Sequence, residues 1–139
     1  MPRPKCRVVL DTNVVVSSLW GGNPGRVVDL WKHGSLLLLV SLPILKENLS
    51  VLARFGLNDD QLKERGLLFL ESPFSTVVHP TSHVDVIKKD PTDNLFLDCA
   101  LEGRADFVVS GDNHLLEVRS FRGMPIVSPA RLLQEFLEK

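Results

Sequence analysis

The chain contains no tyrosine, and phenylalanine and tryptophan together make up 6% of its 139 residues. A surface that holds nucleic acid mainly by stacking bases on aromatic rings is therefore not expected. The two cysteines, Cys6 and Cys99, lack C-x-x-C spacing, which argues against a cysteine metal site or a disulfide framework and predicts free thiols in a reducing compartment. The formal net charge is −1, so no overall basic field indicates a nucleic-acid partner.

Long hydrophobic runs are also absent. The longest, LLLLV at residues 36–40, is far too short to span a bilayer, and MPRPKCRVVLD at the N-terminus lacks the apolar region of a signal peptide. We therefore expect a cytoplasmic protein with no membrane association. Hydrophobic residues make up 44% and charged residues 24%, as in globular proteins, and neither repeats nor a long linker divide the chain. A single domain over residues 1–139 is predicted.

Short apolar runs rich in branched residues alternate with segments of helical character. Strands are predicted over residues 6–11, 35–41, 75–79, 105–110 and 125–128, and helices over 24–34, 41–56, 59–72, 92–103 and 129–139. Alternation of this kind is typical of βαβ units, in which helices cover both faces of a parallel sheet. The predicted fold class is α/β, a three-layer α/β/α sandwich with a central, mostly parallel sheet.

Four carboxylates fall where such a sheet would bring them to one edge. Asp11 closes the first predicted strand, and Asp112 follows the fourth after Ser110 and Gly111. Asp93 opens the helix before that fourth strand, and Glu47 lies in the second turn of the helix after the second strand. Open parallel sheets bind ligands beyond the carboxyl ends of their strands. All four side chains can therefore converge on one site.

Each of these acids alone has a structural explanation. Asp93 and Asp112 are suited to cap helices, Asp11 to close an Asx-turn, and Glu47 to lie on a helix surface. Together they would repel one another unless a cation lay between them. Hard ions such as Mg²⁺ or Mn²⁺ prefer oxygen ligands, whereas tetrahedral zinc prefers histidine and cysteine. The set therefore indicates a Mg²⁺ or Mn²⁺ site and phosphate chemistry.

Four segments resemble, in order and spacing, the PIN-domain ribonucleases. They are VVLDTNVVVSSLW, SLPILKENLSVLARF, DPTDNLFLDCALEGRADFVVSGDNHLL and PIVSPARLL. The resemblance runs from about Val8 to Leu133 and is closest to the prokaryotic branch of toxin components of toxin–antitoxin pairs. It implies a PIN-like, Rossmann-like topology and a metal-dependent endoribonuclease that acts on single-stranded or structured RNA. It also implies an antitoxin protein as partner and a homodimer.

The resemblance further implies roles for particular residues. Asp11, Glu47, Asp93 and Asp112 match the family's four acids and would hold one or two Mg²⁺ or Mn²⁺ ions. The ions would activate a water for attack on the phosphodiester, and Glu47 would bind through water or orient it. Two further residues match supporting positions of the family: Asn13 and Ser110.

Other functions remain open at this stage. A haloacid-dehalogenase-like phosphatase would need Asp-x-Asp after the first strand, where this chain has Asp11-Thr-Asn. A receiver domain would need an acidic pair near the first strand and a lysine after the last strand, and the chain has neither. A catalytically silent PIN-like module that binds RNA or protein is the main alternative. Metal-dependent RNA cleavage discriminates between the enzyme and this module.

Several residues have weaker claims to the site. Asp90 is expected to cap the helix or touch the site, Asp98 to lie near the site or on the surface without binding metal, and His114 to lie on the surface or cap a helix. Trp20 and Trp31 are expected in the core or at a dimer contact. Basic residues that flank the acids are candidates for RNA contact. Lys88 and Lys89 are the strongest candidates, and the weaker ones are Arg3, Lys5, Arg7, Arg119 and Arg122.

Overall fold

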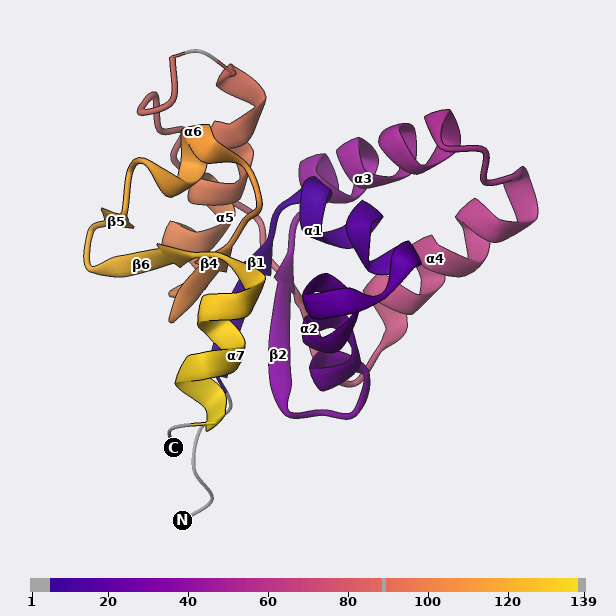
Figure 1. Ribbon diagram of the computed structural model, residues 1–139. Helices are drawn as coiled ribbons and strands as arrows, with labels where there is room; N and C mark the ends of the chain where they lie inside the picture. Colours follow the sequence, from indigo (N-terminus) through magenta and orange to yellow (C-terminus); the bar gives the residue numbers. More distant parts are fainter. Residues whose placement is uncertain (1–5, 89, 138–139) are drawn as a thin grey trace.

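The computed structural model describes residues 6–88 and 90–137 (Figure 1). The expected positions of Arg3, Lys5 and Lys89, and the predicted end of the last helix at 138–139, lie outside this range. None of the helices in the described residues is long and apolar enough to cross a membrane. Neither Cys6 nor Cys99 forms a disulfide within the described part of the chain, and burial raises the pKa of Cys99 to about 12.

A six-stranded sheet forms the centre of the fold, in the order β3-β2-β1-β4-β6-β5. Its five longer strands are parallel, and only β5 runs antiparallel, against β6. The strands are β1 (Cys6–Leu10), β2 (Leu36–Val40), β3 (Ser75–Val77), β4 (Phe107–Val109), β5 (Ser120–Phe121) and β6 (Met124–Val127). This mixed, mostly parallel sheet confirms the predicted α/β sandwich. The short β5 was not predicted.

Helices lie on both faces of the sheet (Figure 1). The α-helices are α1 (Thr12–Ser17), α2 (Gly22–Lys32), α3 (Leu42–Arg54), α4 (Asp59–Glu71), α5 (Asn94–Gly103), α6 (Asn113–Leu116) and α7 (Pro129–Leu137). Two 3₁₀ turns, η1 (Ser18–Trp20) and η2 (Pro91–Asp93), precede α2 and α5. The predicted helices match α2, α3, α4, α5 and α7, whereas α1, η1 and α6 were not predicted.

The alternation of side chains along each strand divides the core in two. Val8 and Leu10 of β1 point to the face covered by α1, α2, α4 and α7, where Trp31 and Leu132 are fully buried. Val9, between them, points to the opposite face, where Leu97 of α5 is fully buried. A strand buried on both faces must be apolar throughout, which explains the continuous runs in the sequence.

Candidate active site

The register of β1 and β4 places Asp11 beside Ser110. Leu10 pairs with Val109, so the next residue of each strand projects from the same edge of the sheet. The Ser110 hydroxyl donates a hydrogen bond to Asp11 Oδ2, while Oδ1 accepts from the Val14 amide at 3.0 Å. Asp11 thus caps α1, where an Asx-turn was the structural alternative. Both contacts fix the carboxylate at the carboxyl end of the sheet.

Asp11 is 2% exposed, and this burial raises its pKa to about 6. The hydrogen bonds from Ser110 and Val14 lower the pKa, and the charge of Asp112 raises it. Desolvation therefore outweighs the hydrogen bonds that favour the ionised form. A nearby cation would remove this penalty.

Asp93 lies at the junction of η2 and α5 and is 7% exposed. Burial, followed by the charges of Asp112, Asp90 and Asp11, raises its pKa to about 7. Its Oδ2 is buried and has no hydrogen-bond partner among the described residues. It makes no capping hydrogen bond to α5; Asp90 caps η2 instead, accepting from the Thr92 amide. A buried carboxylate oxygen without a donor is costly unless something binds it.

Asp112 caps α6, as its structural explanation predicted, accepting from the His114 amide at 2.6 Å. This short turn brings the His114 ring back over the acid, with Nδ1 3.7 Å from Asp112 Oδ1. His114 Nδ1 is buried and without a hydrogen-bond partner in the described part of the chain. One ligand atom each from Asp93, Asp112 and His114 lies within 4.8 Å of the others. His114 therefore belongs to the acid cluster and does more than lie on the surface.

Glu47 reaches the site from α3, on the opposite wall. The Thr12 hydroxyl contacts both Glu47 Oε2 and Asn48 Oδ1, the latter at 2.7 Å. A hydroxyl has one proton, so it donates to only one of these acceptors at a time. Thr12 thus lies between the buried Asn48 and the half-buried Glu47, and its hydroxyl proton orients whichever of the two side chains accepts it. Neither Thr12 nor Asn48 was singled out in the sequence.

The four predicted acids line one cavity of about 330 Å³. Asp90 also lines it, in addition to capping η2. Asn13 is at the rim, its Oδ1 accepting from the Ser17 hydroxyl at 3.3 Å. The structure therefore brings together side chains that lie up to about a hundred residues apart along the chain. Their catalytic and metal-binding roles remain predictions.

The donor set fits a divalent cation. The charge of Asp112 contributes to the raised pKa values of Asp11 and Asp93, and Asp93 Oδ2 and His114 Nδ1 are buried with no hydrogen-bond partner within the described ranges. Oxygen donors predominate, as Mg²⁺ and Mn²⁺ prefer, and one imidazole nitrogen suits Mn²⁺ better than Mg²⁺. The acid-only cluster expected from the sequence thus has a histidine at its edge.

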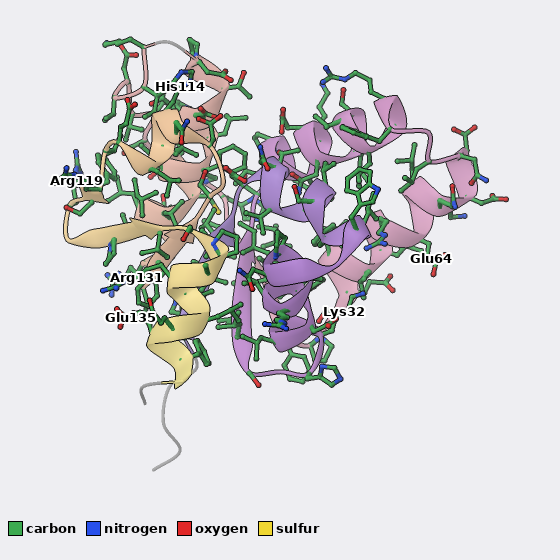
Figure 2. The ribbon with its side chains drawn as sticks, in the orientation of Figure 1. Lys32, Glu64, His114, Arg119, Arg131 and Glu135 are labelled. Carbon is green, nitrogen blue, oxygen red and sulfur yellow. The ribbon has the colours of Figure 1, made fainter. Side chains whose placement is uncertain are left out.

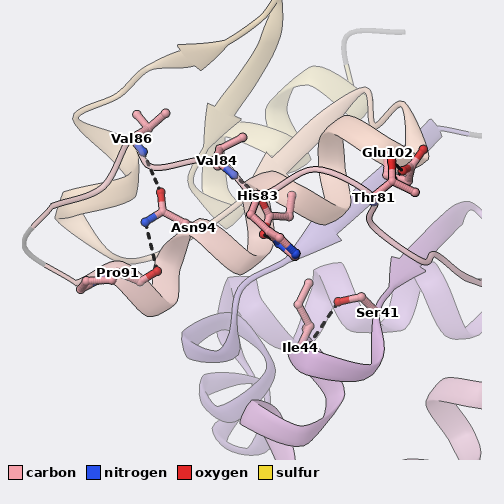
Figure 3. A network of polar contacts seen from close by, with 10 residues as sticks. Ser41, Ile44, Thr81, His83, Val84, Val86, Pro91, Asn94 and Glu102 are labelled. Atoms are coloured by element: carbon pink, nitrogen blue, oxygen red, sulfur yellow. Dashed lines mark hydrogen bonds and ion pairs between the residues drawn. The ribbon is translucent and has the colours of Figure 1, made fainter.

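Asp98 and Asn94 have a different role; Figure 3 labels Asn94 with Val86 and Pro91, which it contacts. Asp98 is buried and accepts hydrogen bonds from the Val84 amide at 2.7 Å and from His83 Nδ1. Asn94 bonds the backbone of residues 86, 87 and 91. These two side chains fasten the segment before η2 onto α5. The surface alternative for Asp98 is therefore wrong, and Asp98 does not line the cavity.

The flanking basic residues lie around the fold rather than in the cavity. Lys88 forms an exposed ion pair with Asp85, and Arg122 lies over the Phe121 ring. The Arg7 side chain donates to the Gly103 carbonyl. Arg119 is exposed on the β5 side of the molecule (Figure 2). None of these four residues lines the acid cavity.

The two tryptophans differ from each other. Trp31 is buried in the core, stacked on Phe69, as expected. Trp20 is 69% exposed, so the core expectation is wrong for it. Its ring meets that of Phe55, and both line the acid cavity. The Gly21-Gly22 pair that follows Trp20 was the one sign in the sequence that the chain turns outward there.

The fold and site define an α/β protein with a carboxylate-lined cavity at the carboxyl edge of a parallel sheet. Residues 7–114 match the model of the PIN domain family. The uncharacterized protein MJ1680 of Methanocaldococcus jannaschii is 32% identical over 126 residues, which cover 86% of this chain and 79% of that protein. The chain belongs to the PIN domain family, whose members are generally nucleases that use divalent metal ions.

A solved structure supports the fold independently. The crystal structure of PAE2754 from Pyrobaculum aerophilum matches 97% of this chain and 91% of its own length, with a TM-score of 0.55. The two sequences are 17% identical, so the likeness concerns the fold alone.

Proposed function

We propose that this chain is a Mg²⁺- or Mn²⁺-dependent endoribonuclease that hydrolyses phosphodiester bonds of RNA. The observation that carries the proposal is the convergence of Asp11, Glu47, Asp93 and Asp112 on one cavity. Burial and mutual repulsion raise the pKa values of Asp11 and Asp93, which makes the cluster unfavourable without a cation. Family membership supports a nuclease, and the oxygen donors support the choice of metal.

The acidic side chains of the cavity have separate roles in this proposal. Asp11, Asp93 and Asp112 would hold the ion, with Asp11 oriented by Ser110 and α1. When bound, a divalent cation lowers the pKa of water and stabilises charge that develops on a phosphodiester. Glu47, in contact with Thr12 on the opposite wall, is placed to orient the attacking water or accept its proton. In this reaction water supplies the nucleophile, and no side chain forms a covalent bond with the substrate.

Cleavage of a fluorescence-quenched single-stranded RNA tests this function. We expect cleavage with Mg²⁺ or Mn²⁺ and none with excess chelator. The cleavage rate should fall at least about 100-fold in Asp11→Asn, because loss of a direct metal ligand should cost at least as much as loss of a residue that orients a ligand. Asp60→Asn, an exposed acid of α4 remote from the cavity, is the matched control and should keep full activity. Wild-type protein that binds RNA without metal-dependent cleavage would establish the silent module instead.

We also propose that this nuclease acts in the cytoplasm as the toxin of a type II toxin–antitoxin pair, as a homodimer. The support is the resemblance of its four motifs to toxin members of the family. Induced expression in a bacterial host should arrest growth, and Asp11→Asn should not. Co-expression of the neighbouring gene's product should restore growth. Normal growth during expression of active wild-type nuclease would rule out the toxin role.

A further inference from the structure

Two exposed aromatic rings stand at the mouth of the acid cavity. Trp20 is 69% exposed and Phe55 is 57% exposed, and both contribute to the cavity wall. Their centroids are 5.6 Å apart with planes at 70°, an edge-to-face pair. By contrast, Trp31, Phe69 and Phe96 are buried. Large aromatic side chains normally bury most of their surface, so a pair left in solvent beside a site indicates a ligand.

The backbone holds both rings in place. Trp20 ends η1 and is followed by Gly21 and Gly22, both with positive φ. The Gly21 amide donates a hydrogen bond to the Ser18 carbonyl and closes the turn. Phe55 is the C-cap of α3, where its amide reaches the carbonyls of Val51 and Leu52. The two rings therefore project from the ends of helices with defined geometry. In an edge-to-face pair, at least one face of each ring remains open for a further ring.

Positive charge lies directly beyond Trp20. A second hollow of about 290 Å³ is lined by Ser18, the first residue of η1, and by Gly21, which follows the turn. Arg26, Lys32 and Arg65 line it, with Asp29 as the one acid (Lys32 is labelled in Figure 2). Within the described residues, none of the three cations forms an ion pair with a carboxylate. Trp20 lines the acid cavity and Ser18 lines the basic hollow, so the two hollows border the same turn, η1.

We propose that Trp20 and Phe55 stack an unpaired base of a single-stranded RNA whose scissile phosphate lies in the acid cavity. This inference rests on the proposed function and names its substrate class. Carboxylates repel a polyanion wherever no cation intervenes, so the strand must be held by other groups. Stacking of a base on the aromatic rings holds the strand, and so does ion pairing of its phosphates with Arg26, Lys32 and Arg65. A duplex keeps its base faces stacked on one another and cannot offer one to the rings.

This arrangement differs from the expectation drawn from composition. A chain poor in aromatic residues was not expected to hold RNA mainly by stacking. Two rings suffice here, because they flank the reacting phosphate and select an unpaired base beside it.

Binding of a 12-nucleotide single-stranded RNA, followed by fluorescence anisotropy, tests the proposal. Ca²⁺ replaces Mg²⁺, because it also takes oxygen ligands, so the readout does not depend on cleavage. We expect Kd to rise about 10-fold in Trp20→Ala and in Phe55→Ala, and less than about threefold in Trp20→Phe. Leu67→Ala, which removes another exposed apolar side chain (43% exposed) away from the cavity, is the matched control and should bind as wild type does.

An abasic scan sharpens the test. In each RNA of a series, one base is removed, at a different position. Wild type should bind one RNA of the series more weakly than the others, whereas Trp20→Ala should bind all of them with the same Kd. Duplex RNA should bind wild type and Trp20→Ala alike. Reversal of charge in the basic hollow, as in Arg26→Glu, should reduce the slope of log Kd against log salt by about 0.7 for each phosphate that the hollow no longer binds.

Two results would overturn the proposal. One is single-stranded RNA binding that is unchanged in both Trp20→Ala and Phe55→Ala. The other is a wild-type oligomer that these variants dissociate while RNA binding stays intact, which would make the ring pair a protein contact. A failure of cleavage with base-dependent binding preserved would contradict only the proposed nuclease activity.

Discussion

At the scale of single residues, most of the candidate site could be predicted from position in the chain. Asp11 and Asp112 follow strands, and parallel strands bring their carboxyl ends to one edge. His114 could not be predicted in the same way, because its ring turns back only through the α6 turn that Asp112 caps. The exposure of Trp20 had only the Gly21-Gly22 pair as a sign in the sequence, because large aromatic side chains usually bury most of their surface.

Asp93→Asn should stabilise the metal-free protein at pH 8. The pKa of Asp93 rises from 3.8 to about 7 in the folded state, so between about pH 4 and 7 the folded state binds more protons than the unfolded state. Stability must therefore fall as pH rises through this range, and the penalty is complete above pH 7. We expect urea unfolding to show an increase of about 1–3 kcal/mol in the free energy of unfolding at pH 8 and none at pH 4. A decrease at pH 8 would contradict this electrostatic account.

His114 should tune the choice of metal. An imidazole nitrogen favours Mn²⁺ over Mg²⁺ more than a carboxylate oxygen does. We expect His114→Ala to weaken Mn²⁺ binding about 10-fold and Mg²⁺ binding much less, measured by calorimetric titration of metal-free protein. His33→Ala, the same change at an exposed histidine on α2's C-cap, is the control. Equal weakening for both metals would contradict a role of His114 in the choice of metal, and unchanged binding of both would place His114 outside the site.

At the scale of elements, strands and long helices were predictable because each has a strong apolar pattern. The three-turn α3 begins after Ser41, whose hydroxyl accepts from the Ile44 amide, and its bounds agree closely with the prediction. The short α1 was missed because Val14, Val15 and Val16 favour strands. It forms because Asp11 caps it and the three valines are buried in the core. The order of strands in the sheet could not be predicted, since alternation alone does not define it.

The segment that leads into η2 depends on Asn94. Asn94→Ala would leave the buried or half-buried backbone groups at 86, 87 and 91 without the partners that Asn94 supplies. We expect a decrease of about 2–4 kcal/mol in the free energy of unfolding and faster hydrogen exchange at the Val86 and Ile87 amides. Asn58→Ala, which removes an exposed helix cap, should cost about 1 kcal/mol and leave those amides protected. Equal protection in both variants would show that Asn94 does not hold the segment.

At the scale of the whole molecule, the sheet carries a cluster of acids at one edge, and the repulsion between these acids destabilises the metal-free fold. A divalent cation should therefore stabilise the fold as a whole. At a concentration about 100 times its Kd, Mn²⁺ should add about 2.7 kcal/mol and raise Tm by about 5–10 °C. The shift should grow from pH 6 to pH 8, because Asp93 and Asp11, with pKa values of about 7 and 6, must lose their protons to bind the ion. An equal shift in Asp112→Asn would place the ion elsewhere.

Anomalous diffraction from crystals soaked in Mn²⁺ tests the central claim most directly. We predict a peak among the oxygens of Asp11, Asp93 and Asp112, roughly 2.0–2.3 Å from its ligands, and its disappearance in crystals of Asp93→Asn. Glu47 should face the same peak across the cavity, directly or through water. A map with no peak there, or with a peak that persists in Asp93→Asn, would contradict the claim that these distant acids share a cation.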